Sequence, residues 1–316
     1  MAKKTFTKAE LETLSPETII KKIQRDNYSL LTSLGGEKLR KEMVPVGKAC
    51  HAAVNYFYQV GPTKTKAKKI KKAKKRIVKT LKKLSPAKYD KKDFAKLSKS
   101  GLVIGFNHPS LGEILRIILM KVDTMGDKPM LFPVNLPWYE SIAKDYNRLK
   151  DLGIIIVPTI TPSTWKKLNI SKDDPLYEPA NNLKHAFKNL YTEASNNTVK
   201  NGGIIFVAPS ATRQQTVFKT KAVFNQAEPI IPTMSVLALS LINAKIDCNF
   251  LPLAILPPKN FKRGLNLFKR YHLYAGEPMA LADIQKNYKK VDRRLEGFDY
   301  EFHLRIAEKL PKQFWY

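Results

Sequence analysis

The sequence predicts an α/β protein with a mixed, mainly parallel sheet flanked by helices and with a helical N-terminal domain. From about residue 100 onward, short apolar runs alternate with segments of helical periodicity, which is typical of a parallel sheet. Before residue 100 the periodicity is helical and lysine is abundant. We therefore predict a basic helical domain over residues 1–95 and an α/β domain over residues 96–316.

The first two helices are predicted from their end signals. Ser15-Pro16-Glu17 fits a helix N-cap followed by proline at the first helical position. Residues Glu37–Tyr58 form a second candidate helix. We expect this helix to be bent or broken near Pro45 and Gly47, because proline removes a backbone hydrogen bond.

A third helix is predicted over Lys64–Lys83, which contains eleven lysines, one arginine and no acidic residue. Apolar residues recur at helical spacing, so the helix has a narrow apolar stripe and a strongly basic face. The stripe consists of Ile70, Ile77, Leu81 and Leu84. The basic face is interpreted either as a solvated surface or as an electrostatic docking surface.

The α/β domain is predicted from the alternation of strand and helix patterns. Strands are expected at Leu102–Phe106, Met130–Val134, Ile154–Val157, Gly203–Ala208, Glu228–Leu239, Asn249–Leu256 and Tyr271–Gly276. Helices are expected at Gly112–Val122, Tyr139–Leu152 and Ala180–Lys200. In such sheets the functional site lies at the carboxyl ends of the strands.

Composition narrows the class of partner. The 316 residues include 56 Lys/Arg and 27 Asp/Glu, a formal charge of +29, and 43% are hydrophobic, so intrinsic disorder is excluded. Residues 1–100 hold 27 of the cationic and 8 of the acidic residues. Such an excess favours acidic partners: nucleic acid, an anionic membrane surface, an acidic carrier protein or a phosphorylated substrate.

Cysteine content and hydropathy predict the location. Cys50 and Cys248 are the only cysteines, which gives neither a disulfide framework nor metal-ligand spacing, so no metal site is expected. The polar N-terminus does not resemble a signal peptide, and no apolar run reaches the roughly 18 residues of a spanning helix. We predict a cytoplasmic protein that associates peripherally with the inner face of a membrane.

One strand end carries a histidine and a carboxylate. The segment Asn107-His108 follows the strand Leu102–Phe106, and Glu113 comes five residues after His108. At this spacing the carboxylate can reach an imidazole nitrogen and leave the other nitrogen as a general base. Alternatively, His108 caps a helix and Glu113 faces solvent. Spacing alone favours that alternative.

Two other strand ends carry cations. The run Ala208-Pro209-Ser210-Ala211-Thr212-Arg213 places small residues before an arginine that can hold a phosphate or carboxylate bidentately. Lys166 and Lys167 follow the strand Ile154–Val157 and suit an anion site. Taken separately, these segments also fit an ordinary turn and an ordinary basic loop.

Taken together and in order, these segments resemble the blocks of the glycerolipid acyltransferase superfamily over roughly residues 95–280. The first block, a histidine followed by an acid, is matched by Asn107-His108 to Glu113. The stretch that leads into the second block is matched by Met130–Val134 with Leu149–Pro158. Ala208–Arg213 resembles the third block and Glu228-Pro229-Ile230-Ile231-Pro232 the fourth. The closest variant is the soluble chloroplast-type glycerol-3-phosphate acyltransferase, which also has Ala-Pro-Ser in the third block and a helical N-terminal domain.

The resemblance implies transfer of a fatty acyl group from a thioester to the hydroxyl of glycerol 3-phosphate or a lysophospholipid. His108 would be the general base and Glu113 would support it. Binding of the acceptor would involve Arg213 with Lys166 or Lys167, and also Ser210, Thr212 and Asn107. No cofactor is implied; the donor would be a coenzyme A thioester or acyl carrier protein.

The sequence departs from the family pattern at three places. Glu113 stands where the family has Asp, Val157-Pro158 where the second block has Arg, and Ser210 where the membrane-bound enzymes have Glu. An alternative is therefore a catalytically degenerate member that binds lipid or carrier protein. A nucleic-acid-binding protein is less favoured, because the basic helix has no interleaved aromatic residues for base stacking.

Overall fold

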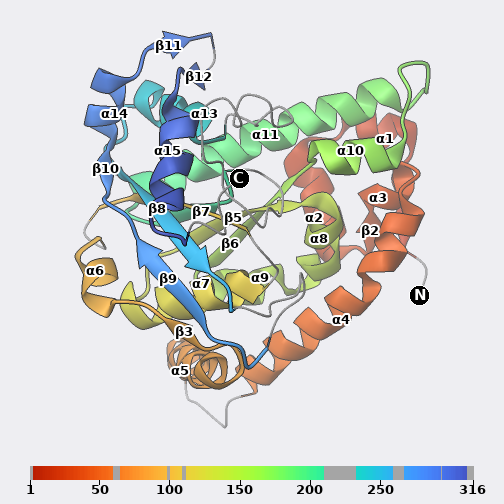
Figure 1. Ribbon diagram of the computed structural model, residues 1–316. Helices are drawn as coiled ribbons and strands as arrows, with labels where there is room; N and C mark the ends of the chain where they lie inside the picture. The colour runs from red at the N-terminus through yellow and green to blue at the C-terminus, as the bar shows by residue number, and fades with distance from the viewer. Residues whose placement is uncertain are drawn as a thin grey trace. The chain divides into compact units, whose positions relative to one another are not determined.

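The computed structural model describes residues 3–59, 65–97, 100–108, 112–209, 233–258, 267–292 and 294–311 (Figure 1). The chain forms two compact units, each built from two stretches of sequence. Unit 1 comprises Met1–Ala73 and Leu131–Ala194, and unit 2 comprises Lys74–Met130 and Ser195–Tyr316. The predicted fold class is confirmed: helices flank mainly parallel strands, and the N-terminal region is helical. The boundary between residues 95 and 96 stays a prediction.

Unit 1 contains the N-terminal helices and a strand–helix–strand segment. From the first stretch it takes β1 (Lys4–Thr5), α1 (Lys8–Thr13), α2 (Pro16–Arg25), β2 (Tyr28–Ser29), α3 (Leu30–Ser33) and α4 (Glu37–Tyr58). From the second it takes β5 (Met130–Asn135) except Met130, α8 (Leu136–Ile142), η2 (Ala143–Asp145), α9 (Tyr146–Asp151), β6 (Ile154–Thr159) and α10 (Pro162–Leu168). Strands β5 and β6 are neighbours, and α8 and α9 pack against β6.

Helix α2 begins where its cap residues predict. Ser15 Oγ accepts a hydrogen bond from Thr18 N at 3.3 Å, and Pro16 is the first helical residue. Helix α4 runs through Pro45 without a break, so of the two expected outcomes, a bend or a break, the break is absent. A Cβ added at Gly47 would lie 2.6 Å from the carbonyl oxygen of Ser141, so glycine allows α4 to pack closely on α8. We infer that this packing outweighs the hydrogen bond lost at Pro45.

Unit 2 is a sheet covered by helices. Its elements are β3 (Ala87–Lys88), α6 (Lys91–Lys96), β4 (Leu102–Phe106), α7 (Gly112–Thr124), β7 (Ile204–Val207), α13 (Thr233–Asn243), β8 (Asn249–Leu256), β9 (Tyr271–Ala275), β10 (Met279–Ala280), α14 (Leu281–Asn287), β11 (Lys290–Val291), β12 (Arg294–Leu295) and α15 (Phe298–Ala307). Helices α5 (Lys66–Leu84) and α11 (Tyr177–Lys200) contribute residues to both units.

The sheet of unit 2 has the order β3-β9-β8-β4-β7, with β10 also paired to β8. Strand β4 is parallel to both β7 and β8, with Val103 opposite Ile205 and Phe250, whereas β8 and β9 are antiparallel. Every residue of β4 is buried. Figure 1 shows α15 over β8, where the two pack together. The carboxyl end of β4 therefore lies between two hydrogen-bonded neighbours.

One strand prediction is wrong. Residues 228–232 of the predicted strand Glu228–Leu239 lie outside the described residues, but from Thr233 onward the chain is helix α13. The backbone N–H groups of Met234 and Ser235 donate to Asp299 Oδ1 at 2.9 and 3.3 Å, so a buried carboxylate from α15 caps the helix. A short apolar run has the same pattern in a strand and in a buried helix, and the cap is remote in sequence.

Helix α13 has 11 residues and α7 has 13, and both are largely buried. Within the described ranges, no helix combines the length and the apolar character that crossing a membrane requires.

The predicted helix Tyr139–Leu152 is divided between α8, η2 and α9.

The absence of a side chain at Gly105 allows α15 to approach β4. A Cβ at this position would overlap the Phe302 ring and lie 3.1 Å from Met234 Cε. We therefore expect Gly105→Ala to lower the free energy of unfolding by about 1–3 kcal/mol, measured by urea denaturation. Phe302→Leu in the same chain should recover part of the loss. An unchanged midpoint for Gly105→Ala would contradict this packing.

Candidate functional site

The site lies in unit 2 where β4 ends, and Asn107 fixes that end. The Asn107 side chain donates from Nδ2 to the carbonyl oxygen of Ile255 at 2.9 Å. Its Oδ1 accepts from the Ile255 N–H at 2.6 Å. The buried amide thus continues the pairing of β4 with β8 one residue beyond the strand, and it holds the backbone that leads into His108.

His108 and Glu113 are brought together at this end. Nδ1 of His108 is hydrogen-bonded to Oε1 of Glu113, which lies in the first turn of α7. The Glu113 side chain is fully buried, whereas 19% of the His108 side chain is exposed. The interpretation that placed Glu113 in solvent is therefore wrong. The carboxylate lies inside the protein and the imidazole lies between it and the surface.

This arrangement determines which nitrogen of His108 can take a proton. An ionised carboxylate only accepts hydrogen bonds, so its partner Nδ1 carries the shared hydrogen and Nε2 keeps its lone pair. Among the described residues, Nε2 of His108 has no hydrogen-bond partner. The Phe106 ring meets the imidazole edge to face at 6.2 Å and limits its rotation. The pair thus has the chemistry of a supported general base.

Arg116 is a third charged residue near the pair, and the sequence interpretation missed it. It is fully buried on α7, donates from Nη1 to the Gly112 carbonyl at 2.7 Å and from Nη2 to the Lys269 carbonyl at 2.9 Å, and lies 4.3 Å from the Tyr271 ring centre. Burial lowers the pKa of Arg116, while Tyr271 and Glu113 raise it. Its charge offsets the buried carboxylate. The signal in the sequence is an arginine inside an apolar helix three residues after Glu113.

The structure does not test the remaining predicted site residues. Lys166 and Lys167 are exposed on α10, which belongs to unit 1. Ser210, Thr212 and Arg213 lie outside the described residues. Their roles in binding an acceptor stay predictions, as do the catalytic roles of His108 and Glu113.

Unit 1 contains a second histidine–carboxylate pair, which the sequence interpretation also missed. His51 Nδ1 lies 3.0 and 2.9 Å from the two oxygens of buried Asp145, and His51 Nε2 lies 3.0 Å from Asn55 Nδ2. Arg148 in turn binds Asn55 Oδ1. Because both ring nitrogens of His51 are engaged, this network ties α4 to the η2–α9 segment. His51 and Asp145 are 94 positions apart in the sequence, so local sequence patterns do not reveal the pair.

Neither cysteine has the environment of a nucleophile. Burial is the main cause that raises the pKa of both the Cys50 and the Cys248 thiols, which favours the unreactive protonated form. Within the described ranges, no group of three or more His, Cys, Asp or Glu side chains is arranged to hold a metal ion.

Comparison with known proteins returns no matching family model and no matching curated sequence.

The His108–Glu113 bond can be tested without any assumption about substrate. Replacing Glu113 with Gln retains the shape of the side chain but allows it to donate as well as accept a hydrogen bond. We expect Glu113→Gln to shift the ¹⁵N resonances of neutral His108 from the Nδ1–H form toward a mixture of tautomers. His51, whose partner is Asp145, is the internal control and should not change. An unaltered His108 tautomer in Glu113→Gln would contradict the described pairing.

Proposed function

We propose that the protein is an O-acyltransferase that moves a fatty acyl group from a thioester to the hydroxyl of a phosphorylated glycerol. The observation that carries this proposal is the hydrogen bond between partly exposed His108 and fully buried Glu113 at the carboxyl end of β4. This edge is where an α/β sheet presents its catalytic residues. The order of motifs along the chain, which resembles the glycerolipid acyltransferases, supplies the reaction class.

In this reaction Nε2 of His108 takes the proton of the acceptor hydroxyl as the oxygen attacks the thioester carbonyl carbon. The tetrahedral intermediate collapses, the carbon–sulfur bond breaks, and the departing sulfur receives the proton from the imidazolium. Glu113 stabilises the imidazolium without taking its proton. General base catalysis of this type contributes roughly 10²–10⁴-fold. No covalent intermediate on the enzyme is needed, in keeping with the raised pKa values of both thiols.

The donor in this proposal is a coenzyme A thioester or an acyl carrier protein, and both are anionic. The acceptor is glycerol 3-phosphate or a lysophospholipid, with Arg213, Lys166 or Lys167 proposed to hold its phosphate. Ser210 and Thr212 are proposed to line the same site. Asn107, to which the resemblance also assigns acceptor binding, has both Nδ2 and Oδ1 bonded to the Ile255 backbone, so we propose that it positions His108 instead.

Helix α5 supports docking on an anionic membrane surface. Lys75, Lys79 and Lys83 recur every four residues and are exposed on one face of the part of α5 that belongs to unit 2. The backbone N–H of Phe268 donates to the carbonyl oxygen of Leu84 at 2.6 Å, which places an aromatic residue with 67% of its surface exposed at the end of this helix. Cations beside an exposed aromatic suit the interface of an anionic bilayer.

Experiments can distinguish this proposal from two alternative functions. A degenerate family member would bind lipid or carrier protein without turnover. A nucleic-acid-binding protein would use α5, but α5 has no aromatic residue between Lys66 and Leu84 on which bases could stack.

The catalytic proposal is tested by supplying the purified protein with a long-chain acyl-coenzyme A or acyl carrier protein and with glycerol 3-phosphate. We expect ester product, and we expect His108→Ala to lower kcat by about 10²–10⁴-fold. His51→Ala is the matched control, since it removes the other carboxylate-paired histidine, and should retain at least half of the activity. Glu113→Asp restores the family acid and should remain active.

Absence of product with either donor, or equal rates for the wild type and His108→Ala, would contradict the catalytic assignment. Retained binding of acyl carrier protein or lipid without turnover would favour the degenerate binder. Tighter binding to duplex DNA or RNA than to anionic vesicles, with strong salt dependence, would favour the nucleic-acid function.

The docking proposal is tested by sedimentation with phosphatidylglycerol-containing vesicles. Replacing Lys75, Lys79 and Lys83 with Gln should weaken binding at least about tenfold, because each lysine near an anionic surface contributes about 1 kcal/mol. The matched control is the triple replacement of exposed Lys286, Lys289 and Lys290 with Gln, which removes the same charge elsewhere in unit 2. Equal losses in the two triple variants would show that net charge, rather than α5, controls binding.

A further inference from the structure

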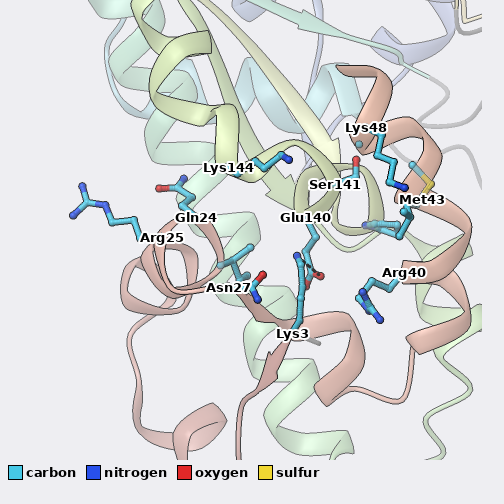
Figure 2. Close-up of a pocket in the computed structure, with 14 residues that line it drawn as sticks. Lys3, Gln24, Arg25, Asn27, Arg40, Met43, Lys48, Glu140, Ser141 and Lys144 are labelled. Carbon is cyan, nitrogen blue, oxygen red and sulfur yellow. Dashed lines mark ion pairs between the residues drawn. The ribbon is translucent and has the colours of Figure 1, made fainter. Parts of the chain in front are cut away.

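Unit 1 contains a basic pocket that has no part in the proposed acyl transfer. The pocket has a volume of about 400 Å³ and lies along one face of α4 and one face of the α8–η2 segment (Figure 2). Its lining includes five cationic residues and one acidic residue, Glu140. The cations are Lys3, Arg25, Arg40, Lys48 and Lys144.

Helical spacing builds the pocket from both sides. Lining residues three or four positions apart lie on the same face of a helix. On α4 these are Arg40, Met43, Val44, Gly47 and Lys48, and on α8 and η2 they are Pro137, Glu140, Ser141 and Lys144. Figure 2 shows Lys3 and Glu140 facing each other, with Arg40 and Lys48 on one side and Lys144 on the other. The close contact of Gly47 with Ser141 fixes the spacing of the two helical faces.

Glu140 can offset only one of these five cations, and the fold also uses its carboxylate. Oε2 accepts from Ser29 Oγ at 2.7 Å and Oε1 accepts from Leu31 N at 2.9 Å. Lys3 Nζ lies 4.0 Å from the same side chain. Burial is the main cause that lowers the pKa of Lys3; Glu140 raises this pKa, whereas Arg40 and Lys144 lower it. The pocket keeps a large positive excess.

Arg40 supplies a donor that has no acceptor. Its Nε is buried and has no hydrogen-bond partner among the described residues, while Nη2 lies 3.5 Å from Glu37. A buried donor left without an acceptor is unfavourable, so an anion or a water molecule that bonds to Arg40 Nε would remove this cost. Lys48 and Lys144 have no ion pair within the described ranges. These groups are available to an anion.

Charge and size together select the class of ligand. A phosphate monoester carries close to two negative charges at neutral pH and offers three acceptor oxygens, which matches several cations and a guanidinium. The volume falls in the range of small-molecule sites and exceeds what a lone phosphate fills. Ile23, Met43, Val44 and Pro137 provide an apolar wall for the remainder of the ligand.

We propose that this pocket binds a small phosphate monoester with a short apolar group, held by Arg40, Lys144, Lys48 and Lys3. The inference goes beyond the acyltransferase proposal and uses none of the residues around His108. The phosphate is recognised by the charged rim and the apolar group by the wall that Met43 and Val44 form on α4.

Isothermal titration calorimetry of the full chain with three probes tests the proposal. Hexyl phosphate is expected to bind with a micromolar to low-millimolar Kd. Inorganic phosphate, which lacks the apolar group, should bind at least about tenfold more weakly, since burial of two methylenes already accounts for that factor. Hexanoate, which has a similar chain but a single charge, should also bind at least about tenfold more weakly.

Two variants connect binding to the pocket. Arg40→Gln and Lys144→Gln should each weaken hexyl phosphate binding about tenfold or more while the thermal unfolding midpoint stays near that of the wild type. Lys41→Gln is the matched control, because Lys41 pairs with the same Glu37 carboxylate at 3.4 Å but does not line the pocket. His108→Ala should bind hexyl phosphate as the wild type does, whether or not it transfers acyl groups.

Failure of hexyl phosphate to bind at 10 mM would overturn the proposal. Equal effects of Lys41→Gln and Arg40→Gln would also overturn it, because binding would then follow overall charge. Tighter binding of inorganic phosphate than of hexyl phosphate would exclude the apolar component. These outcomes do not depend on the acyl transfer assay.

Discussion

The burial of the Glu113 carboxylate at the end of β4 constrains everything around it. An ionised carboxylate cannot be buried without partners, because it loses the solvation of water. His108 provides a hydrogen bond from the preceding strand end, and Arg116 provides a positive charge one turn along α7. Two further hydrogen bonds fix the backbone near the pair. Asn107 bonds the end of β4 to β8, and Arg116 on α7 donates to the carbonyl oxygen of Lys269. The same contacts that satisfy the charge therefore orient the imidazole.

The central sheet provides the rigidity that this constraint requires. Strand β4 is hydrogen-bonded on both sides, and Gly105 allows α15 to cover it closely. The His51 network shows the contrast within the same chain, since a histidine bonded at both nitrogens stabilises its surroundings and has no nitrogen left for a substrate proton. The two histidine–carboxylate pairs therefore differ at Nε2. In His51 this nitrogen is bonded to Asn55, whereas in His108 it has no partner among the described residues and can accept a substrate proton.

Much of the fold could be predicted from local patterns, because strand runs such as Leu102–Phe106 and caps such as Ser15 act over a few residues. The helix at Thr233 could not, because its cap Asp299 lies more than sixty residues away. His108 and Glu113 were predictable as a pair from their spacing, although spacing alone favoured the wrong interpretation; burial decides between the two. Arg116 and the basic pocket depend on packing between distant segments, which periodicity does not reveal.

The structure describes two regions in which the cationic residues gather: the exposed lysines of α5 and the pocket beside α4.

We propose that His108 and Glu113 act as one catalytic unit. A double-mutant cycle on acyl transfer from thioester to glycerol 3-phosphate is the most direct test. We expect His108→Ala to lower kcat strongly and the addition of Glu113→Gln to have little further effect, since Glu113 acts through the imidazole. Independent, multiplicative losses from the two substitutions would contradict it.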